Sequence, residues 1–449
     1  MKITNKKVLA LLLALTVVIS LAGCGGNNSD NSGSSKPTTS GNKQVDADEA
    51  AFFDNIPAEL IGTTVKFATW IDHTKTEAAP VMADFTDLTG IKVALDTISQ
   101  GEYITKLSAR IAAGQSPDIV VENGDWPRTL ACLTPLDECG VDVTDPFWDQ
   151  QVVKYSTIGK KTYLVNGKNS IWNMSSAVVY YNKTIFDDYS IKTPTEYIKE
   201  NNWTWETFKK AMKDVVASDS ELIGASIDAN AFSRSYNGLW VAFDPDTDTF
   251  SNVSSRSELL DTYKYMLEAK ESKYAKISGN GVDGSFTSGK CGMALAGAYG
   301  LRATGWLTTM DPDDIEFAYL PKRNKSDANY PSGSTFRSYG VCKGSKNPVA
   351  SGYFLRYFLN GDNYDHDTVF LNDEAEKWYT ELRDSSDIAL IHWTGGVYGN
   401  VYTAGVGYMN DVLKGSSSQI STNIAKVSGT LDKCIAEANK IMKDVISKQ

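Results

Sequence analysis

The chain has 449 residues, of which 42% are hydrophobic, and it carries a formal net charge of −11. Nucleic acid and anionic lipid surfaces repel an acidic protein, so we expect neither as a partner. The length exceeds what one ordinary hydrophobic core accommodates, which predicts two lobes. The six cysteines lack any C-x-x-C spacing and the three histidines lie far apart, so no metal site and no cofactor is expected.

The head of the chain has the order of charged and apolar residues that secretory signal peptides share. Lysines at positions 2, 6 and 7 precede an apolar run over 8–21, and Leu21-Ala-Gly-Cys24 follows. The run is too short for a comfortable transmembrane helix. Its ending resembles the lipobox of bacterial lipoproteins, which implies removal of residues 1–23 and lipidation of Cys24. The alternative is a plain signal peptide in which the cysteine occurs by chance.

Residues 24–60 are expected to form a linker between the lipidated cysteine and the folded part. From Gly25 to Lys43 the residues are mainly Gly, Asn, Ser and Thr, which bury too little apolar surface to offset the entropy of ordering. The stretch from Val45 to Glu59 is mixed and acidic, which is compatible with partial order. We therefore expect the folded body to begin near Ile61.

The first part of the body alternates strand and helix patterns. Strands are predicted at 64–70, 91–95 and 119–121, and two helices are predicted between them, the first ending at Gly90 and the second at Gly114. This alternation is typical of an α/β domain with a parallel sheet. Ligands of such sheets bind beyond the carboxyl ends of the strands, where the loops Trp70–Asp72 and Glu122–Trp126 lie.

The second part repeats this mixture and ends in a long helix. Strands are predicted at 177–181, 293–296, 317–320 and 339–342, and helices after Thr204, at 260–267 and at 353–359. Apolar residues from Ile420 to Val445 recur at steps of four and three. Both a coiled coil and a helix packed along the body give this pattern, and the second is favoured. Most cysteines are expected to be small buried residues, although Cys132 and Cys139 are near enough in the sequence to pair.

Short motifs along the chain resemble a known family. In chain order these motifs are Trp70-Ile-Asp72, residues 85–93, 107–114 and 116–119, Thr134-Pro-Leu-Asp137, residues 179–183 with Phe186, residues 203–208, residues 286–290 with Met293, and residues 343–348. In this order they resemble the extracellular solute-binding proteins of bacterial ABC importers, in the class that includes maltose-binding protein. The resemblance covers nearly the whole body.

The resemblance implies the two-lobed, type II periplasmic-binding-protein fold, with a mainly parallel sheet flanked by helices in each lobe. Crossovers near 173–178 and 317–321 would give an N-terminal lobe of 62–175 and 322–372. The C-terminal lobe would then comprise 176–321 and 373–449. The ligand would be clamped between the lobes. A lipid anchor on Cys24 would suit a Gram-positive cell, with the protein a monomer on the extracellular face of the membrane.

Aromatic, acidic and amide residues at the strand ends suit a carbohydrate ligand, because aromatic rings cover the C–H faces of sugars and carboxylates and amides bind the hydroxyls. The candidate ligand-binding residues are Trp70, Asp72, Glu122, Asn123, Asp125, Trp126 and Tyr299, with Trp172, Trp240, Trp393 and Tyr398 as looser candidates. In the family, Tyr299 corresponds to an aromatic stacking position. The implied function is capture of an oligosaccharide and its delivery to an ABC transporter permease.

Other functions fit the sequence less well. The run Gly284 to Lys290 has the letters of a phosphate-binding loop, but Cys291 replaces the required Ser or Thr and no apolar strand precedes it. A surface glycoside hydrolase would need a carboxylate pair that no spacing singles out. A receptor of the same fold for a non-sugar solute and an adhesive surface lipoprotein also remain as alternatives. No catalytic residues are predicted.

Overall fold

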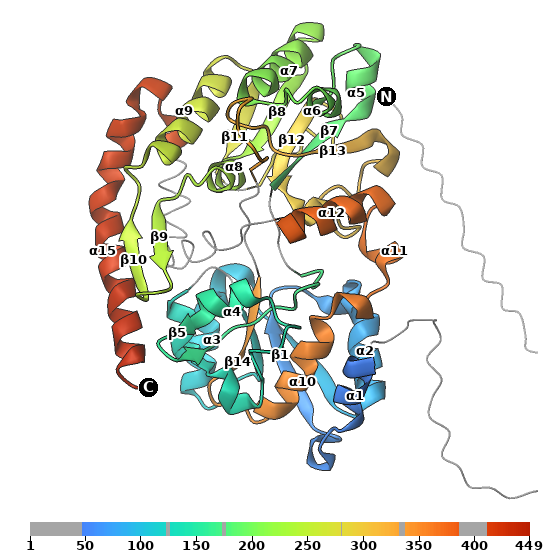
Figure 1. The fold of residues 1–449 in the computed structure, drawn as a ribbon, viewed down its shortest axis with the longest axis vertical. Coiled ribbons are helices and arrows are strands. Elements are labelled where there is room, and N and C mark those ends of the chain that lie inside the picture. The colour runs from blue at the N-terminus through green and yellow to red at the C-terminus, as the bar shows by residue number, and fades with distance from the viewer. Residues whose placement is uncertain (1–46, 123–125, 173–176, 280, 332–336, 386–410) are drawn as a thin grey trace, which may run out of the picture. The chain divides into compact units, whose positions relative to one another are not determined.

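The computed structural model describes residues 47–122, 126–172, 177–279, 281–331, 337–385 and 411–449 (Figure 1). Asp46–Gln449 forms one compact unit. Several predictions fall outside the described residues, namely those for the signal peptide, Cys24, Asn123, Asp125, Trp393, Tyr398 and most of the first crossover. Within the described residues, no helix is long and apolar enough to cross a membrane.

The first sheet contains the strands of the first section together with one strand from late in the sequence. Its order is β2 (Lys92–Thr97), β1 (Thr64–Thr69), β3 (Ile119–Glu122), β14 (Ser338–Cys342) and β4 (Leu133–Thr134). β1 runs parallel to β2 and β3, whereas β14 is antiparallel to β3. The elements around it are α1 (Ala47–Asp54), α2 (Ala78–Thr89), α3 (Tyr103–Ala112), α4 (Gln150–Ser156), α10 (Pro348–Phe358) and the hairpin β5 (Thr157–Ile158) and β6 (Lys161–Thr162).

The second sheet has the order β11 (Ala275–Ser278), β8 (Ile223–Asp228), β12 (Cys291–Gly297), β7 (Ala177–Asn182) and β13 (Ile315–Ala318). β8 is parallel to β11 and β12, and β7 is antiparallel to both of its neighbours. Its helices are α5 (Lys183–Asp188), α6 (Pro194–Lys199), α7 (Trp205–Ser218), α8 (Ala229–Ser235) and α9 (Ser257–Glu271). Two helix-flanked sheets confirm the predicted α/β fold class (Figure 1), although each sheet combines two parallel with two antiparallel pairings rather than being mainly parallel. The lobe boundaries stay a prediction.

Local sequence signals explain where several elements begin and end. Thr204 caps α7 in a reciprocal capping box with Thr207, as the sequence predicted for this residue. Gly90 ends α2 in the left-handed region at φ 71°. Val81 and Phe85 of α2 are buried, whereas Leu88 near its end is 54% exposed. The sequence prediction missed β8, β11 and the hairpin of β9 (Val241–Asp244) and β10 (Thr249–Asn252).

The folded chain begins earlier than the expected start near Ile61. α1 packs on α10 through Phe53, which is buried and makes an edge-on ring contact with Tyr357. Arg356 of α10 binds Glu49 of α1 at 2.8 Å and Asp145 at 2.6 Å. Because one guanidinium binds two carboxylates, charge-assisted hydrogen bonds hold α1 in place in addition to the apolar contact. The part of the expected linker from residue 47 onward therefore belongs to the body.

The last helix, α15 (Ile420–Ile446), lies along the body, which confirms the packed arrangement over the coiled coil. Asn439 holds it to β10 by two hydrogen bonds with the backbone of Phe250, at 2.7 and 2.9 Å. At its far end the side chain of Gln449 donates to the carbonyl of Ile158 in β5 at 2.7 Å. Two further helices, α11 (His366–Val369) and α12 (Asp373–Ser385), precede it in the described chain.

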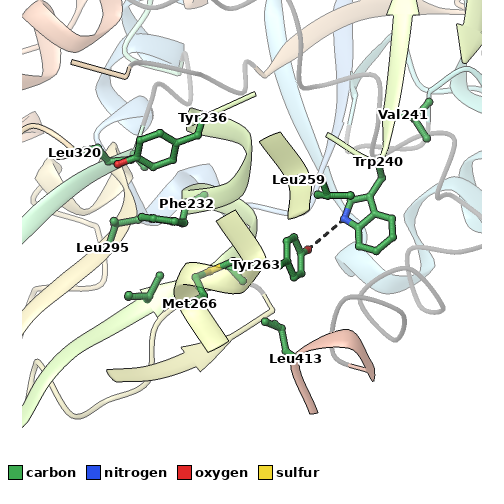
Figure 2. Close-up of a cluster of buried hydrophobic side chains, with 14 of the residues drawn as sticks. Phe232, Tyr236, Trp240, Val241, Leu259, Tyr263, Met266, Leu295, Leu320 and Leu413 are labelled. Atoms are coloured by element: carbon green, nitrogen blue, oxygen red, sulfur yellow. Dashed lines mark hydrogen bonds between the residues drawn. The ribbon is translucent and has the colours of Figure 1, made fainter. Parts of the chain in front are cut away.

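The core of the second sheet is rich in aromatic rings, and Trp240 is part of it. Figure 2 shows Trp240 beside Leu259, with its indole N–H directed at the hydroxyl of Tyr263. That hydrogen bond measures 3.2 Å, and Trp240 is 7% exposed. Five cysteines in the described chain are free thiols, and all but Cys434 are buried, which confirms that they are small core residues rather than a disulfide framework.

Candidate functional site

The carboxyl ends of the first sheet's parallel strands bring three separate segments to one edge. Ala68 of β1 pairs with Val120 of β3, and Ser338 of β14 pairs with Glu122. This register places Trp70, Glu122 and Arg337 next to one another at the edge. Trp70 is half-buried, with its ring edge-on to Tyr103 at 5.5 Å. The guanidinium of Arg337 lies 5.1 Å from the centre of the Trp70 ring.

Asp72 follows in the same loop, and its carboxylate is used within that loop. It accepts hydrogen bonds from the backbone N–H and the hydroxyl of Thr74, and Lys75 binds it at 2.9 Å. These contacts, with the hydrogen bonds from Thr74 and Lys75 the largest, lower the pKa of Asp72 to about 2. The side chain is thus a charged cap of the turn His73–Lys75.

Glu122 and Trp126, two further predicted ligand residues, lie inside the protein. Glu122 is 1% exposed and its carboxylate accepts the backbone N–H of Trp126 at 2.9 Å. The ring of Trp126 is fully buried in the same core cluster as Tyr103 and Leu107. In this structure Trp126 therefore supports the strand-end loop from the core side.

His73 follows Asp72 in a loop, yet its side chain lies inside the protein. The ring is 1% exposed, stacks on Phe67 with centres 5.6 Å apart, and meets Trp172 edge-on at 4.8 Å. Its Nδ1 lies 3.2 Å from the hydroxyl of Thr76. Burial lowers the pKa of His73 to about 3, with smaller contributions from Arg337 and Arg302. The imidazole is therefore neutral at physiological pH.

Protonation of His73 is expected to make folding stability depend on pH. Its folded-state pKa of about 3 lies below the ordinary value of 6.5, so between these values the unfolded chain binds a proton that the folded chain does not. Stability should fall by about 2 kcal/mol between pH 6.5 and pH 5 from this group. Denaturant unfolding of the parent and of His73→Phe at both pH values measures the difference. Identical pH slopes for the two proteins would contradict the prediction.

A buried ion pair adjoins this edge. Glu77 at the start of α2 binds Arg302, and their side chains are only 3% and 8% exposed. The Arg302 guanidinium also covers the ring of Trp172 at 4.2 Å. Trp172 itself stacks on Phe358 and donates its indole N–H to Tyr364 at 2.7 Å. Trp172, a looser ligand candidate, is 1% exposed and lies among these side chains.

The second sheet presents an equivalent edge. Leu295 of β12 pairs in parallel with Ile227 of β8, so Asp228 and the turn after β12 lie at neighbouring strand ends. Asp228 is buried, accepts the backbone N–H groups of Ala231 at 2.9 Å and Gly281 at 2.7 Å, and has its pKa raised by burial. Tyr299 is half-buried, and burial followed by the charge of Asp228 raises its pKa.

The structure thus brings Trp70 together with Glu122 at one strand-end edge and places Tyr299 at another, with Trp126, Trp172 and Trp240 in the cores. Sequence reasoning missed Asp228, Arg337 and the burial of His73. The sequence signal that could have identified Asp228 is the strand Ile223-Gly-Ala-Ser-Ile-Asp228, which ends at this residue. Its Gly, Ala and Ser are weak strand formers, so the strand pattern was not recognised. Among the described residues, no group of His, Cys, Asp and Glu side chains has the arrangement of a metal site.

Comparison with solved structures supports the fold. The GacH receptor of Streptomyces glaucescens matches with a TM-score of 0.59 and 17% identity, over 82% of this chain and 98% of that one. The galacto-N-biose/lacto-N-biose I-binding protein of the Bifidobacterium longum ABC transporter gives 0.63 and 15%, over 84% and 98%. The sugar-binding protein MalE of Xanthomonas citri gives 0.61 and 14%, over 85% and 99%.

No curated protein matches the chain significantly. A family model described as bacterial extracellular solute-binding protein matches residues 69–364, which is more than half of the chain. The fold agrees with this match, because it has two helix-flanked sheets with candidate ligand residues at their strand ends. The chain belongs to the family of bacterial extracellular solute-binding proteins.

Proposed function

We propose that the protein captures a carbohydrate between two lobes and delivers it to the permease of an ABC importer. The observation that carries the proposal is the pair of strand-end edges, each with a half-buried aromatic ring beside ionisable groups: Trp70 near Glu122, and Tyr299 near Asp228. Ring faces and carboxylates are the groups that sugars need. Structural neighbours named for complexes with acarbose, cycloalternan and lacto-N-biose support a sugar as ligand.

The proposed site separates contact residues from supporting residues. Trp70 and Tyr299 would stack on sugar rings, with Asp72 beside Trp70, and the buried carboxylates of Glu122 and Asp228 would support the two edges. Trp126, Trp172 and Trp240 would hold these edges from the core. Asn123, Asp125, Trp393 and Tyr398 remain proposed contacts on the basis of the sequence alone.

Binding of an oligosaccharide is tested by thermal shift against a panel of mono- and oligosaccharides. A ligand at 100 times its dissociation constant stabilises the folded protein by about 2.7 kcal/mol. Small-angle scattering with the best ligand should then show a smaller radius of gyration, because lobes that both contact the ligand close around it. Analysis of the recovered sugar separates a receptor from a hydrolase, since a receptor releases the ligand unchanged. An unaltered scattering profile at saturation would contradict hinged closure.

The proposed anchor is a lipid on Cys24, which would hold the protein on the extracellular face of the cell membrane. Acyl chains supply membrane affinity of about 0.8 kcal/mol for each buried methylene. Cys24→Ala should move the protein from the membrane fraction to the medium, with Cys434→Ala as the matched control that stays with the membrane. Retention of Cys24→Ala in the membrane fraction would point to a different anchor.

A further inference from the structure

Arg337 is the one charged side chain placed directly over a proposed stacking ring at the first sheet's edge, as far as the described residues show. It precedes β14, whose first residue Ser338 pairs with Glu122. Its guanidinium lies 5.1 Å from the centre of the Trp70 ring, and the residue is partly exposed. An arginine in this position covers the ring and presents its N–H donors at the margin of the same surface.

The neighbouring charges at this edge already have partners. Asp72 is bound by Lys75 at 2.9 Å, and Glu77 is bound by Arg302. Glu122 accepts the backbone N–H of Trp126. Among the described residues, by contrast, no carboxylate lies within 4.0 Å of the guanidinium of Arg337, although ion pairs at that distance are found for Arg323 and Arg356.

The positive charge of Arg337 acts on the groups around it. It contributes to the lowered pKa of His73, after burial, and its charge together with a polar contact of its side chain with Tyr339 opposes the rise that burial causes in the pKa of that tyrosine. Both effects have the sign expected of a nearby cation, and Arg302 affects the pKa values of these two groups in the same direction. Arg337 therefore places a positive charge at an edge that also holds the carboxylates of Asp72 and Glu122, in a chain of net charge −11. Salt screens charges beyond about 8–10 Å, so a ligand in contact with this edge responds to Arg337 rather than to the distant acidic surface.

A guanidinium pairs best with a planar carboxylate, which it binds through two parallel hydrogen bonds. A neutral sugar on Trp70 would remove water from Arg337 without supplying a counter-charge, and this costs free energy. We propose that Trp70 and Arg337 form a subsite for a sugar that carries a carboxylate, that is, a uronic-acid residue of an oligosaccharide. This inference rests on the proposed carbohydrate-binding function and specifies its ligand class.

The experiment uses ligands that differ only in charge. Trisaccharides of galacturonate, glucuronate and mannuronate are each titrated as the free acid and as the methyl ester, with neutral oligosaccharides alongside, by calorimetry on the full mature chain. At least one free acid should bind tenfold or more tightly than its methyl ester. Arg337→Gln should remove that preference, and Arg337→Lys should retain part of it. The preference should also weaken as salt is raised.

Two variants control for folding and for arginine in general. Arg323 also lies over aromatic rings, Trp205 at 5.2 Å and Tyr236 at 5.7 Å, so Arg323→Gln should leave the preference unchanged. Trp70→Ala should weaken acid and ester alike, because it removes the stacking face. Equal loss of acid and ester affinity in Arg337→Gln would overturn the subsite. Tight binding of neutral sugars with no acid preference would overturn the subsite alone, whereas binding of no sugar would overturn the proposed function and the subsite with it.

Discussion

Glu77→Gln is expected to lower the free energy of unfolding by about 3–5 kcal/mol, because it leaves Arg302 as a buried charge without its partner. The two side chains are only 3% and 8% exposed, so water cannot take the place of the lost carboxylate. Denaturant unfolding measures the effect as a shift in midpoint at an unchanged slope. Asp187→Asn is the matched control, because it breaks the exposed pair with Lys183 and should change stability by less than about 1 kcal/mol.

A second variant separates the destabilisation caused by an unpaired buried charge from the net contribution of the ion pair to stability. Replacing both partners, as Glu77→Gln with Arg302→Met, removes the uncompensated charge and keeps an apolar side chain over Trp172. The double variant should therefore be more stable than Glu77→Gln alone. If Glu77→Gln behaves like the surface control, the ion pair is not buried in solution and the prediction fails.

Trp126→Ala is expected to cost about 3–5 kcal/mol of stability, because its ring is fully buried in the core. Trp70 follows a neighbouring strand but is half-buried, so Trp70→Ala should cost clearly less stability. For sugar binding we expect the opposite order of the two variants, because Trp70 is the proposed stacking residue. Trp70→Ala should lose at least about 2 kcal/mol of binding free energy for the sugar. Unfolding and titration of both variants test the contrast. Equal stability losses would contradict the different burial of the two rings.

This contrast shows what the sequence could not resolve in the site. Trp70 and Trp126 each follow a strand and each stand among acidic residues, so both fit the pattern of a ligand loop. Burial depends instead on what packs against the loop, and Trp126 packs among Tyr103 and Leu107 of α3. His73 is similar, since its ring is enclosed by Trp172 and Phe358, which are distant in the sequence.

Most strands of the first sheet were predictable because they contain β-branched and aromatic residues, alternating with others in β1 and consecutive in β3. β8 was missed because Gly224, Ala225 and Ser226 are poor strand formers. The structure explains the glycine, since a Cβ there would lie 2.4 Å from the carbonyl oxygen of Met212 in α7. The close approach of α7 requires a glycine at position 224, and strand propensities carry no information about such a tertiary contact.

The long last helix shows the same limit in its periodicity. The predicted apolar stripe alternates steps of four and three from Ile420 to Val445, as in a coiled coil, and this alternation places Cys434 and Ile441 inward. The structure instead buries Ile435 and Met442, so the stripe advances by about 3.7 residues per turn. A nearly straight helix lying on a globular surface has this longer period. The stripe could therefore be assigned correctly only once the surface that the helix packs against was known.

The contacts of α15 connect β10 beside the second sheet with β5 beside the first, through Asn439 and Gln449. Any rotation of the lobes must carry or break the hydrogen bonds at one of these ends. If the lobes close by a hinge as proposed, the free energy of these hydrogen bonds would shift the populations of open and closed molecules before a ligand arrives. A ligand's apparent dissociation constant equals the intrinsic value divided by the competent fraction. Substitutions at Gln449, far from both strand-end edges, would thus alter affinity without touching the ligand.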